Sequence, residues 1–243
     1  MGDELSAVDF RALARSSPWL WSTVQLTYTA RRGWDAEPVR AWVRRPGSLR
    51  VETLDGRLLQ AGVLPPGSAV VLTAGGGEPA RPTTTLPAPR RRDDGLVADR
   101  SVVDRFDTDA PFYRDYHWIA CLDPVELADG DPERGPAGTT ITDVHAVDHR
   151  GRPGWAATVV PAPAYEPRCA CCPLLPSAVA DRLEGIAPTA YADAHLVLLD
   201  RATGICVSTT ELGGPRNGLG HVIGIEAVDD PLADELFAAG GRG

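Results

Sequence analysis

The twenty residues from Arg40 to Leu59, RAWVRRPGSLRVETLDGRLL, constrain the fold more than any other part of the chain. They contain three short strand-like runs, separated by Pro46-Gly47 and Asp55-Gly56. Proline fixes φ and glycine tolerates positive φ, so these pairs are typical of tight hairpin turns. Strands joined in this way form an antiparallel meander, whose apolar face must pack against another layer. The stretch therefore predicts a sheet that is covered on one side.

Similar strand-like runs recur along the rest of the chain. Apolar spacing predicts an amphipathic helix over Asp3–Arg15, and shorter helices are predicted after Asp123 and over Pro176–Leu183. Alternating or β-branched runs predict strands at Ser22–Ala30, Val39–Arg44, Ser48–Leu54, Arg57–Gly62, Ala69–Thr73, Thr139–Val147, Gly154–Val160, Ala194–Leu199, Ile205–Leu212 and His221–Val228. The fold class that follows is α+β, with about ten antiparallel strands and two or three helices on one face of the sheet.

The chain is long enough for one large domain. We expect an N-terminal helix over residues 1–18 and a single domain over residues 19–243. The segment from Gly75 to Asp94 is rich in glycine, proline, threonine and arginine, so an exposed loop is predicted near residues 75–100.

Charge and composition exclude some classes of partner. The net charge is −9, and the arginines are scattered among acidic residues instead of forming a dense basic face, so we expect no nucleic-acid partner. No apolar window approaches the length of a membrane span. The N-terminal residues are acidic and resemble neither a secretory signal nor a transit peptide, so a cytoplasmic location is expected.

Four motifs, taken in order, resemble a known family. They are WVRRPGSLRVETLDG at Trp42–Gly56, the H-R-G-R strand from His149 to Pro161, L-D-R-A-T-G-I at Leu199–Ile205, and V-D-D-P-L-A-D-E-L-F at Val228–Phe237. Together they resemble the LolA-like lipoprotein carriers and the related N-terminal domains of RseB-type sigma-factor regulators, over roughly residues 20–237. The resemblance implies a strongly curved open half-barrel with helices on its concave face. It also implies a cavity for an acyl chain or another apolar ligand.

Aromatic residues supply the candidates for such a cavity. We single out Trp42, Arg50, Tyr116, His117, Trp118 and Trp155 as candidate ligand-binding residues, with Trp19, Trp21 and Tyr28 as further cavity or core aromatics. Aromatic side chains are equally suited to core packing. The block around His117 is also consistent with an ordinary core strand whose side chains alternate between faces.

The cluster Cys169-Ala170-Cys171-Cys172 is the most unusual local chemistry in the chain. Closely spaced thiolates bind zinc, so Cys169, Cys171 and Cys172 are the candidate metal ligands, and zinc is the only cofactor that the sequence suggests. Cys121, Cys206, His195 or His221 are candidates to complete the site. Two other interpretations stay open, namely small buried core residues and a redox or vicinal-disulfide pair.

Three functional hypotheses follow. The first is a non-catalytic module that binds an apolar, lipid-like ligand or a protein segment in the half-barrel. The second is an enzyme that acts by positioning a reactive intermediate, with Tyr116, His117, Glu52 and Arg50 as participants. The third is a zinc-stabilised regulatory or interaction protein. The sequence contains no G-x-S-x-G, H-E-x-x-H or Walker-type motif, which favours the non-catalytic hypotheses.

Overall fold

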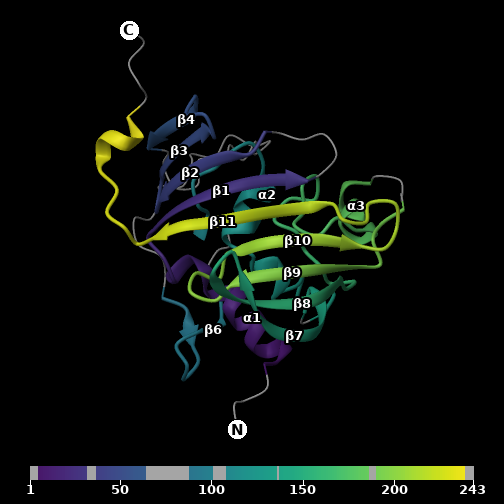
Figure 1. The fold of residues 1–243 in the computed structure, drawn as a ribbon. Coiled ribbons are helices and arrows are strands. Elements are labelled where there is room, and N and C mark those ends of the chain that lie inside the picture. The colour runs from purple at the N-terminus through teal and green to yellow at the C-terminus, as the bar shows by residue number, and fades with distance from the viewer. Residues whose placement is uncertain are drawn as a thin grey trace, which may run out of the picture.

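Nine strands form one antiparallel sheet in the computed structural model, which describes residues 5–31, 37–63, 88–100, 108–135, 137–185 and 190–238. In spatial order the strands are β4 (Leu58–Val63), β3 (Ser48–Thr53), β2 (Val39–Arg44), β1 (Thr23–Arg31), β11 (Gly220–Val228), β10 (Cys206–Leu212), β9 (Ala194–Asp200), β8 (Arg152–Pro161) and β7 (Thr139–His149) (Figure 1). β4 and β7 are its two ends, so the sheet is open over the described residues. The predicted fold class, an α+β half-barrel, is confirmed.

The sheet consists of two meanders that meet in the middle. β1 to β4 form one, β7 to β11 form the other, and β1 pairs with β11 from Val24↔Val228 to Arg31↔Gly220. The turn chemistry places the strand ends as predicted. Pro46-Gly47 separates β2 from β3, and Gly56, with a φ of +92°, lies between β3 and β4. The predicted strand Ala69–Thr73 lies outside the described residues.

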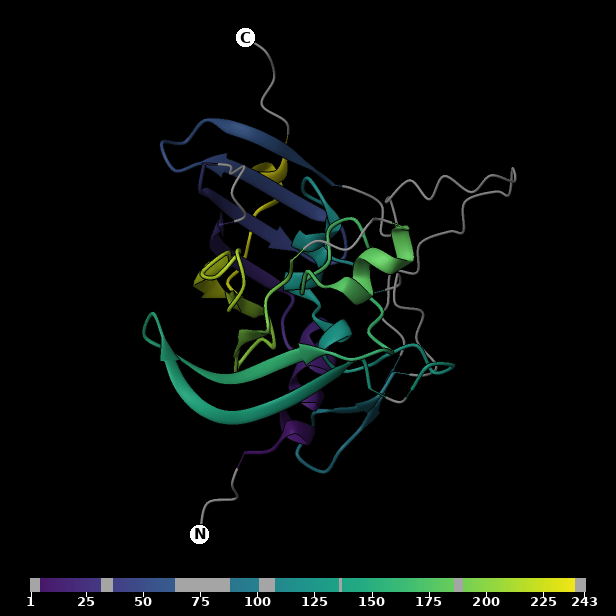
Figure 2. The same cartoon turned by 90° about the vertical axis from the view of Figure 1, so that its right-hand side faces the viewer.

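The α-helices lie on one side of the sheet, where Figure 2 shows them within its curve, whereas η4 (Asp234–Phe237) lies against the other side. α1 (Ala7–Ser16) begins at a capping box, in which Ser6 and Asp9 bond to each other's backbone N–H groups. The other helical segments are η1 (Ser17–Trp19), α2 (Tyr116–Leu122), η3 (Val125–Leu127), α3 (Ala178–Glu184) and η4 (Asp234–Phe237). A small second sheet pairs β5 (Arg90–Arg91) with β6 (Val97–Asp99).

The core lies between the concave face of the sheet and these helices. Val39, Ala41 and Val43 alternate with half-buried residues along β2, which is the pattern of a strand covered on one face. Large side chains from the covering layer fill the space opposite; they include Phe10, Leu13, Trp118, Ile119, Leu122, Leu127, Tyr165, Leu174 and Leu175. Each fully buried side chain of this size contributes roughly 1.5–3 kcal/mol by leaving water.

Two local predictions differ from the structure. The aromatic block that was consistent with a strand is α2, because the Asp115 carboxylate caps the backbone N–H groups of His117 and Trp118 and so begins a helix. Part of the predicted exposed loop near residues 75–100 is the β5–β6 hairpin. Its Val97 is buried and donates its N–H to Ser16 Oγ at 2.7 Å. No helix of the described residues is long and apolar enough to cross a membrane.

Candidate functional site

Cys169 to Cys172, called the thiol loop below, form a turn beside the first residues of α2. The backbone N–H of Cys172 donates to the carbonyl of Cys169 at 3.3 Å, which closes the turn. The three sulfur atoms lie within 4.8 Å of one another, with Cys169 to Cys171 at 2.8 Å and Cys171 to Cys172 at 3.7 Å. Cys171 is exposed, Cys169 is half-buried and Cys172 is buried. The exposure of the thiols therefore decreases in the order Cys171, Cys169, Cys172.

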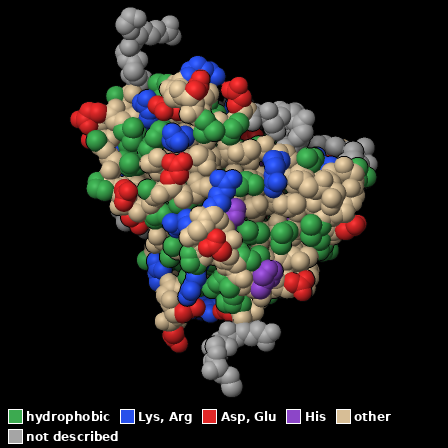
Figure 3. Space-filling model, viewed as in Figure 1, with side chains coloured by type: hydrophobic (Ala, Val, Ile, Leu, Met, Phe, Trp, Pro, Cys, Tyr) green, Lys and Arg blue, Asp and Glu red, His purple; other side chains and the backbone are tan. Residues whose placement is uncertain are grey.

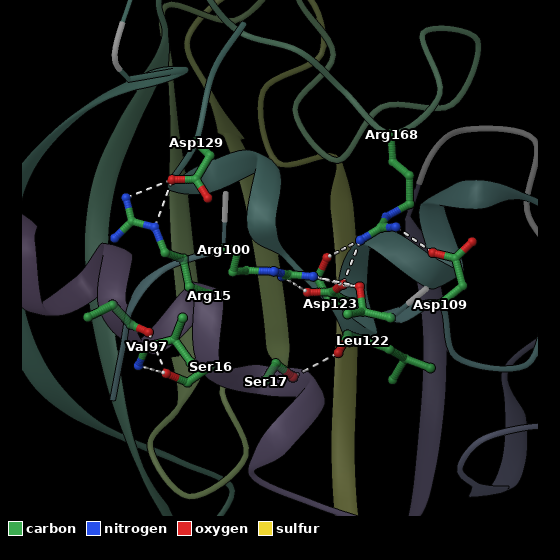
Figure 4. A network of polar contacts seen from close by, with 12 residues as sticks. Arg15, Ser16, Ser17, Val97, Arg100, Asp109, Leu122, Asp123, Asp129 and Arg168 are labelled. Carbon is green, nitrogen blue, oxygen red and sulfur yellow. Dashed lines mark hydrogen bonds and ion pairs between the residues drawn. The ribbon is translucent and has the colours of Figure 1, made fainter. Parts of the chain in front are cut away.

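A buried ionic cluster fixes the chain just before the thiol loop. The Arg168 guanidinium donates to Asp123 at 2.6 Å and also pairs with Asp109. Arg100 donates to both oxygens of Asp123, at 2.7 and 3.0 Å. Figure 4 shows Asp123 between the two arginines, with Asp109 on the far side of Arg168. The side chains of Arg100, Arg168 and Asp123 are each at most 4% exposed, so these charges are screened little by solvent.

The pKa values of the two aspartates in this cluster are shifted in opposite directions. Burial opposes the ionisation of Asp123, but Arg100 and Arg168 outweigh burial and lower its pKa to about 2. At Asp109 burial prevails over the attraction of Arg168 and raises the pKa to about 6. A third guanidinium, that of Arg45, donates to the carbonyl of Thr108 at 2.7 Å, and burial lowers its pKa to about 10. Three cations thus surround two carboxylates.

Glu126 holds the chain on both sides of the thiol loop. Its carboxylate accepts from the backbone N–H of Arg168 and from that of Leu174, each at 2.8 Å. The Tyr165 hydroxyl donates to the same carboxylate at 2.5 Å and accepts from the N–H of Leu175 at 3.1 Å. Burial raises the pKa of Glu126, and these three donors counteract that effect. One buried side chain therefore fixes the distance between the two ends of the loop.

The thiols are arranged for two kinds of chemistry. Burial, and then the neighbouring Cys169, raises the pKa of the Cys172 thiol, so this group is protonated at neutral pH unless a cation compensates its charge. Cys169 and Cys171 are closer than unbonded sulfur atoms ordinarily rest. Either thiol can donate to the other, and a shared cation or a disulfide bond would also join the two sulfur atoms. The loop is therefore suited to bind a thiophilic ion or to undergo reversible oxidation.

The residues predicted to complete this site lie elsewhere. Cys121 and His221 form a separate buried group with His117, described further below. Cys206 is buried, and its thiol faces the carbonyl of Ser208 at 3.7 Å. His195 is also buried, and burial lowers its pKa to about 4. Over the described residues, the three thiols are the protein groups that this candidate metal site brings together.

The six predicted ligand-binding residues do not form one surface. His117, Trp118 and Trp155 are at most 9% exposed and lie in or beside the core, where the resemblance implied an apolar cavity. Tyr116 is half-buried; burial is the main cause of its raised pKa, to which Asp109, Cys169 and Cys172 add. It therefore borders the thiol loop. Trp42 and Arg50 are cross-strand neighbours on the opposite, outer face of the sheet.

The C-terminal segment, Asp229–Ala238, lies against part of that outer face, over β2 and β3. Arg50 donates to the carbonyl of Leu236 at 3.0 Å, and Arg44 donates to that of Leu232 at 2.9 Å. The Arg44 guanidinium also lies 4.7 Å from the centroid of the Phe237 ring. Figure 3 shows basic and acidic side chains interspersed on this side of the molecule.

The four residues proposed for the enzyme hypothesis do not converge. Arg50 pairs with Glu52 on the outer face of β3, whereas Tyr116 and His117 lie on α2 within the curve of the sheet. The structure thus places the two pairs on opposite sides of the sheet. No common surface joins them as one catalytic group.

Comparison with known proteins finds similarity of structure only. No protein-family model matches the chain, and no curated protein matches its sequence. The chain is similar to MucB, of the RseB family with a LolA-like fold. The crystal structure of MucB aligns with 97% of this chain at 14% identity and a TM-score of 0.37. MucB in complex with MucA(peri) aligns with 97% at 15% identity and a TM-score of 0.36.

The complex structure of Pseudomonas aeruginosa MucA/MucB gives the same picture, with 96% of this chain aligned at 15% identity and a TM-score of 0.36. The matched regions are 60–63% of those chains, so this chain spans about three fifths of their length.

Sequence reasoning missed the residues that hold the thiol loop. Asp109, Glu126 and Tyr165 are 59, 42 and 3 positions away from Arg168, and no local motif joins them. The one available signal was the position of Arg168 immediately before the cysteines. An arginine at the entrance to an apolar, cysteine-rich run needs an acidic partner when it is buried.

Proposed function

We propose that this chain is a binding module in which the thiol loop holds a thiophilic metal ion such as Zn²⁺. The observation that carries the proposal is the gathering of three sulfur atoms within 4.8 Å, in a turn held at both ends. Zinc–sulfur bonds of about 2.3 Å in a tetrahedral site place sulfur atoms about 3.8 Å apart. The Cys171–Cys172 separation of 3.7 Å agrees with this value, and the Cys169–Cys171 pair must open to reach it.

The anchors behind the loop support a positioning role. A buried ion-pair cluster is weak evidence for stability, because apolar residues of the same volume often serve as well. Here Asp123 and Glu126 fix Arg168 and Leu174, the residues that bracket the thiols. Ordering a free loop costs about 1–2 kcal/mol for each residue. The contacts of Asp123 and Glu126 order the loop before the ion binds. Three sulfur ligands leave a fourth position for water or a partner's group.

The test is the zinc content of the reduced full-length protein. We expect the triple variant Cys169→Ser/Cys171→Ser/Cys172→Ser to bind one equivalent less than the unmodified chain. The matched control Cys206→Ser changes another cysteine, outside both groups, and should bind as much as the unmodified chain. Equal zinc content in the triple variant would overturn the proposal. A Cys169–Cys171 disulfide in protein kept under reducing conditions, found by mass spectrometry, would favour the redox interpretation instead. The predicted cytoplasmic location would supply that reducing environment.

A second candidate function is the binding of a protein segment to the outer face of β2 and β3. The observation that favours it is the chain's own C-terminal segment, which Arg44 and Arg50 hold through main-chain carbonyls. Backbone carbonyls are common to all peptides, so another extended segment can use the same donors. A synthetic peptide of residues 229–238 should bind the full-length Phe237→Ala variant more tightly than the unmodified chain. Binding that is unaffected by a further Arg50→Ala change would exclude this surface.

A further inference from the structure

His117, Cys121 and His221 form a second group of potential metal ligands, entirely inside the protein. His117 and Cys121 are four residues apart on α2 and therefore lie on the same side of the helix. His221 reaches them from β11. All three side chains are at most 1% exposed, and their ligand atoms lie within 4.8 Å of one another. We propose that these residues form an interior site for a borderline divalent ion, with Zn²⁺ as the probe, separate from the thiol loop.

Two backbone carbonyls fix which imidazole nitrogens carry protons. His117 Nδ1 lies 3.0 Å from the carbonyl oxygen of Pro173, and His221 Nε2 lies 2.9 Å from that of Cys206. A carbonyl oxygen only accepts, so each of these nitrogens donates an N–H. In neutral imidazoles the other two nitrogens, His117 Nε2 and His221 Nδ1, then carry lone pairs. These two nitrogens are 3.3 Å apart.

That distance suits two nitrogens bound to one ion. Zinc–nitrogen bonds of about 2.0–2.1 Å at a tetrahedral angle separate the nitrogens by about 3.3–3.4 Å. A metal-binding histidine usually donates its other N–H to a carbonyl or carboxylate, as both rings do here. The Cys121 sulfur lies 3.5 Å from His221 Nε2, the protonated nitrogen of that ring, and the ligand atoms of the three residues lie within 4.8 Å of one another, so the sulfur is the candidate third ligand. Thr209 Oγ1, 2.9 Å from His221 Nδ1, places an oxygen next to the same position.

The competing account is a hydrogen-bonded network without an ion. In that account the Thr209 hydroxyl donates to His221 Nδ1, and the rings are ordinary buried histidines. The two accounts differ in one respect that can be measured. Only the metal site predicts that His117 Nε2 and His221 Nδ1 respond together when an ion is added.

The first experiment uses the full-length triple serine variant of the thiol loop, so that failure of that loop and of the interior site are distinguishable. After treatment with a chelator, titration with Co²⁺ should give one equivalent of tetrahedral cobalt with a sulfur-to-metal charge-transfer band. Adding Cys121→Ser should remove that band, and adding His221→Gln should weaken binding at least ten-fold. The matched control His195→Gln, which alters a buried histidine outside both groups, should bind normally. Less than a tenth of an equivalent of cobalt in the triple variant would overturn the proposal.

The second experiment leaves His117, Cys121 and His221 unchanged, so it does not depend on whether variants of these three core residues fold. The ring-nitrogen NMR signals of the triple serine variant are recorded before and after addition of Zn²⁺. We expect His117 Nε2 and His221 Nδ1 to shift to metal-bound values, while His117 Nδ1 and His221 Nε2 keep their protons. Unchanged spectra at saturating Zn²⁺ would show that the group is a hydrogen-bonded network only.

Discussion

Asp123 is the residue on which the charges behind the thiol loop converge. Its carboxylate accepts from Arg100, Arg168 and the Thr108 hydroxyl, and its side chain is fully buried. Removing one partner of a buried ion pair leaves a charge without compensation, which costs more than the pair contributes. The stability of this cluster therefore depends on the negative charge of Asp123 between Arg100 and Arg168.

Asp123→Asn is therefore expected to lower the free energy of unfolding by about 3–5 kcal/mol, because the change leaves Arg100 and Arg168 facing a neutral amide. Urea denaturation at neutral pH measures the loss. Asp109→Asn is the matched control. Asp109→Asn should lower the free energy of unfolding clearly less than Asp123→Asn, because burial raises the pKa of Asp109 to about 6 and already disfavours its charged form. Equal losses in the two variants would contradict the assignment of Asp123 as the centre of the cluster.

The same two aspartates predict a pH dependence with two separate windows. The folded-state pKa of Asp123 is lowered from 3.8 to about 2, so its contribution is present above pH 3.8 and is lost as the pH falls toward 2. The pKa of Asp109 is raised from 3.8 to about 6, so its contribution is present below pH 3.8 and is lost as the pH rises to 6.

Urea denaturation between pH 2 and pH 7 separates the two effects. Relative to the unmodified chain, Asp123→Asn should remove about 2 kcal/mol of the loss in the lower window, on the scale of 1.36 kcal/mol for each pKa unit. Asp109→Asn should remove the fall in the free energy of unfolding that the unmodified chain shows between pH 3.8 and pH 6. A difference in the opposite window for either variant would contradict the two pKa directions.

At the scale of elements, the thiol loop depends on Glu126, the middle residue of η3. Glu126→Gln keeps the volume but replaces one acceptor oxygen with an NH₂ group that faces donors, so one end of the loop is released. Residues that orient metal ligands typically change affinity by about 10–100-fold when altered. We expect Glu126→Gln to lower the zinc affinity of the thiol loop by about 10–100-fold and to speed the alkylation of its thiols. Glu133→Gln, at an exposed position, should change neither.

The β9–β10 turn and α1 make a second contact between elements that is sensitive to a single methyl group. Gly204 has a φ of +67°, and a Cβ there would lie 2.7 Å from the carbonyl oxygen of Leu13. Gly185 has nearly the same φ, +68°, with no atom within 4 Å of the added Cβ. Both alanine variants lose about 1–2 kcal/mol from the left-handed backbone.

In Gly204→Ala the steric overlap with α1 should lower the free energy of unfolding by about 1–3 kcal/mol more. Thermal unfolding followed by circular dichroism measures the difference between the two variants. Equal melting temperatures would show that the turn does not pack against α1 as closely as the structure has it.

At the scale of the whole molecule, the sequence predicted the sheet better than the site. Strand alternation and the turns at Pro46-Gly47 and Asp55-Gly56 are local signals, so the nine strands of the main sheet appear within a residue or two of their predicted bounds, whereas β5 and β6 were not predicted. The covering layer was harder to predict. α2 is an apolar aromatic run whose helical state depends on the Asp115 cap, and such a run is also compatible with a strand.

The candidate site was predictable only in part. The three thiols adjoin one another in sequence, so they were found, whereas their anchors come from residues that only the folded chain brings together. Glu126 contacts Tyr165, Arg168 and Leu174 across 39 to 48 positions. His221 meets His117 across 104 positions, because β11 returns to the middle of the sheet beside β1. Neither contact leaves a periodic signal in the sequence.

X-ray absorption at the zinc edge tests the central claim most directly. The sample is the full-length His221→Gln variant loaded with one equivalent of zinc, in which binding at the proposed interior site is weakened at least ten-fold and the thiol loop is unchanged. The account predicts three sulfur neighbours at about 2.3 Å from the ion. A shell of nitrogen and oxygen alone, or a variant that retains no zinc under reducing conditions, would contradict it.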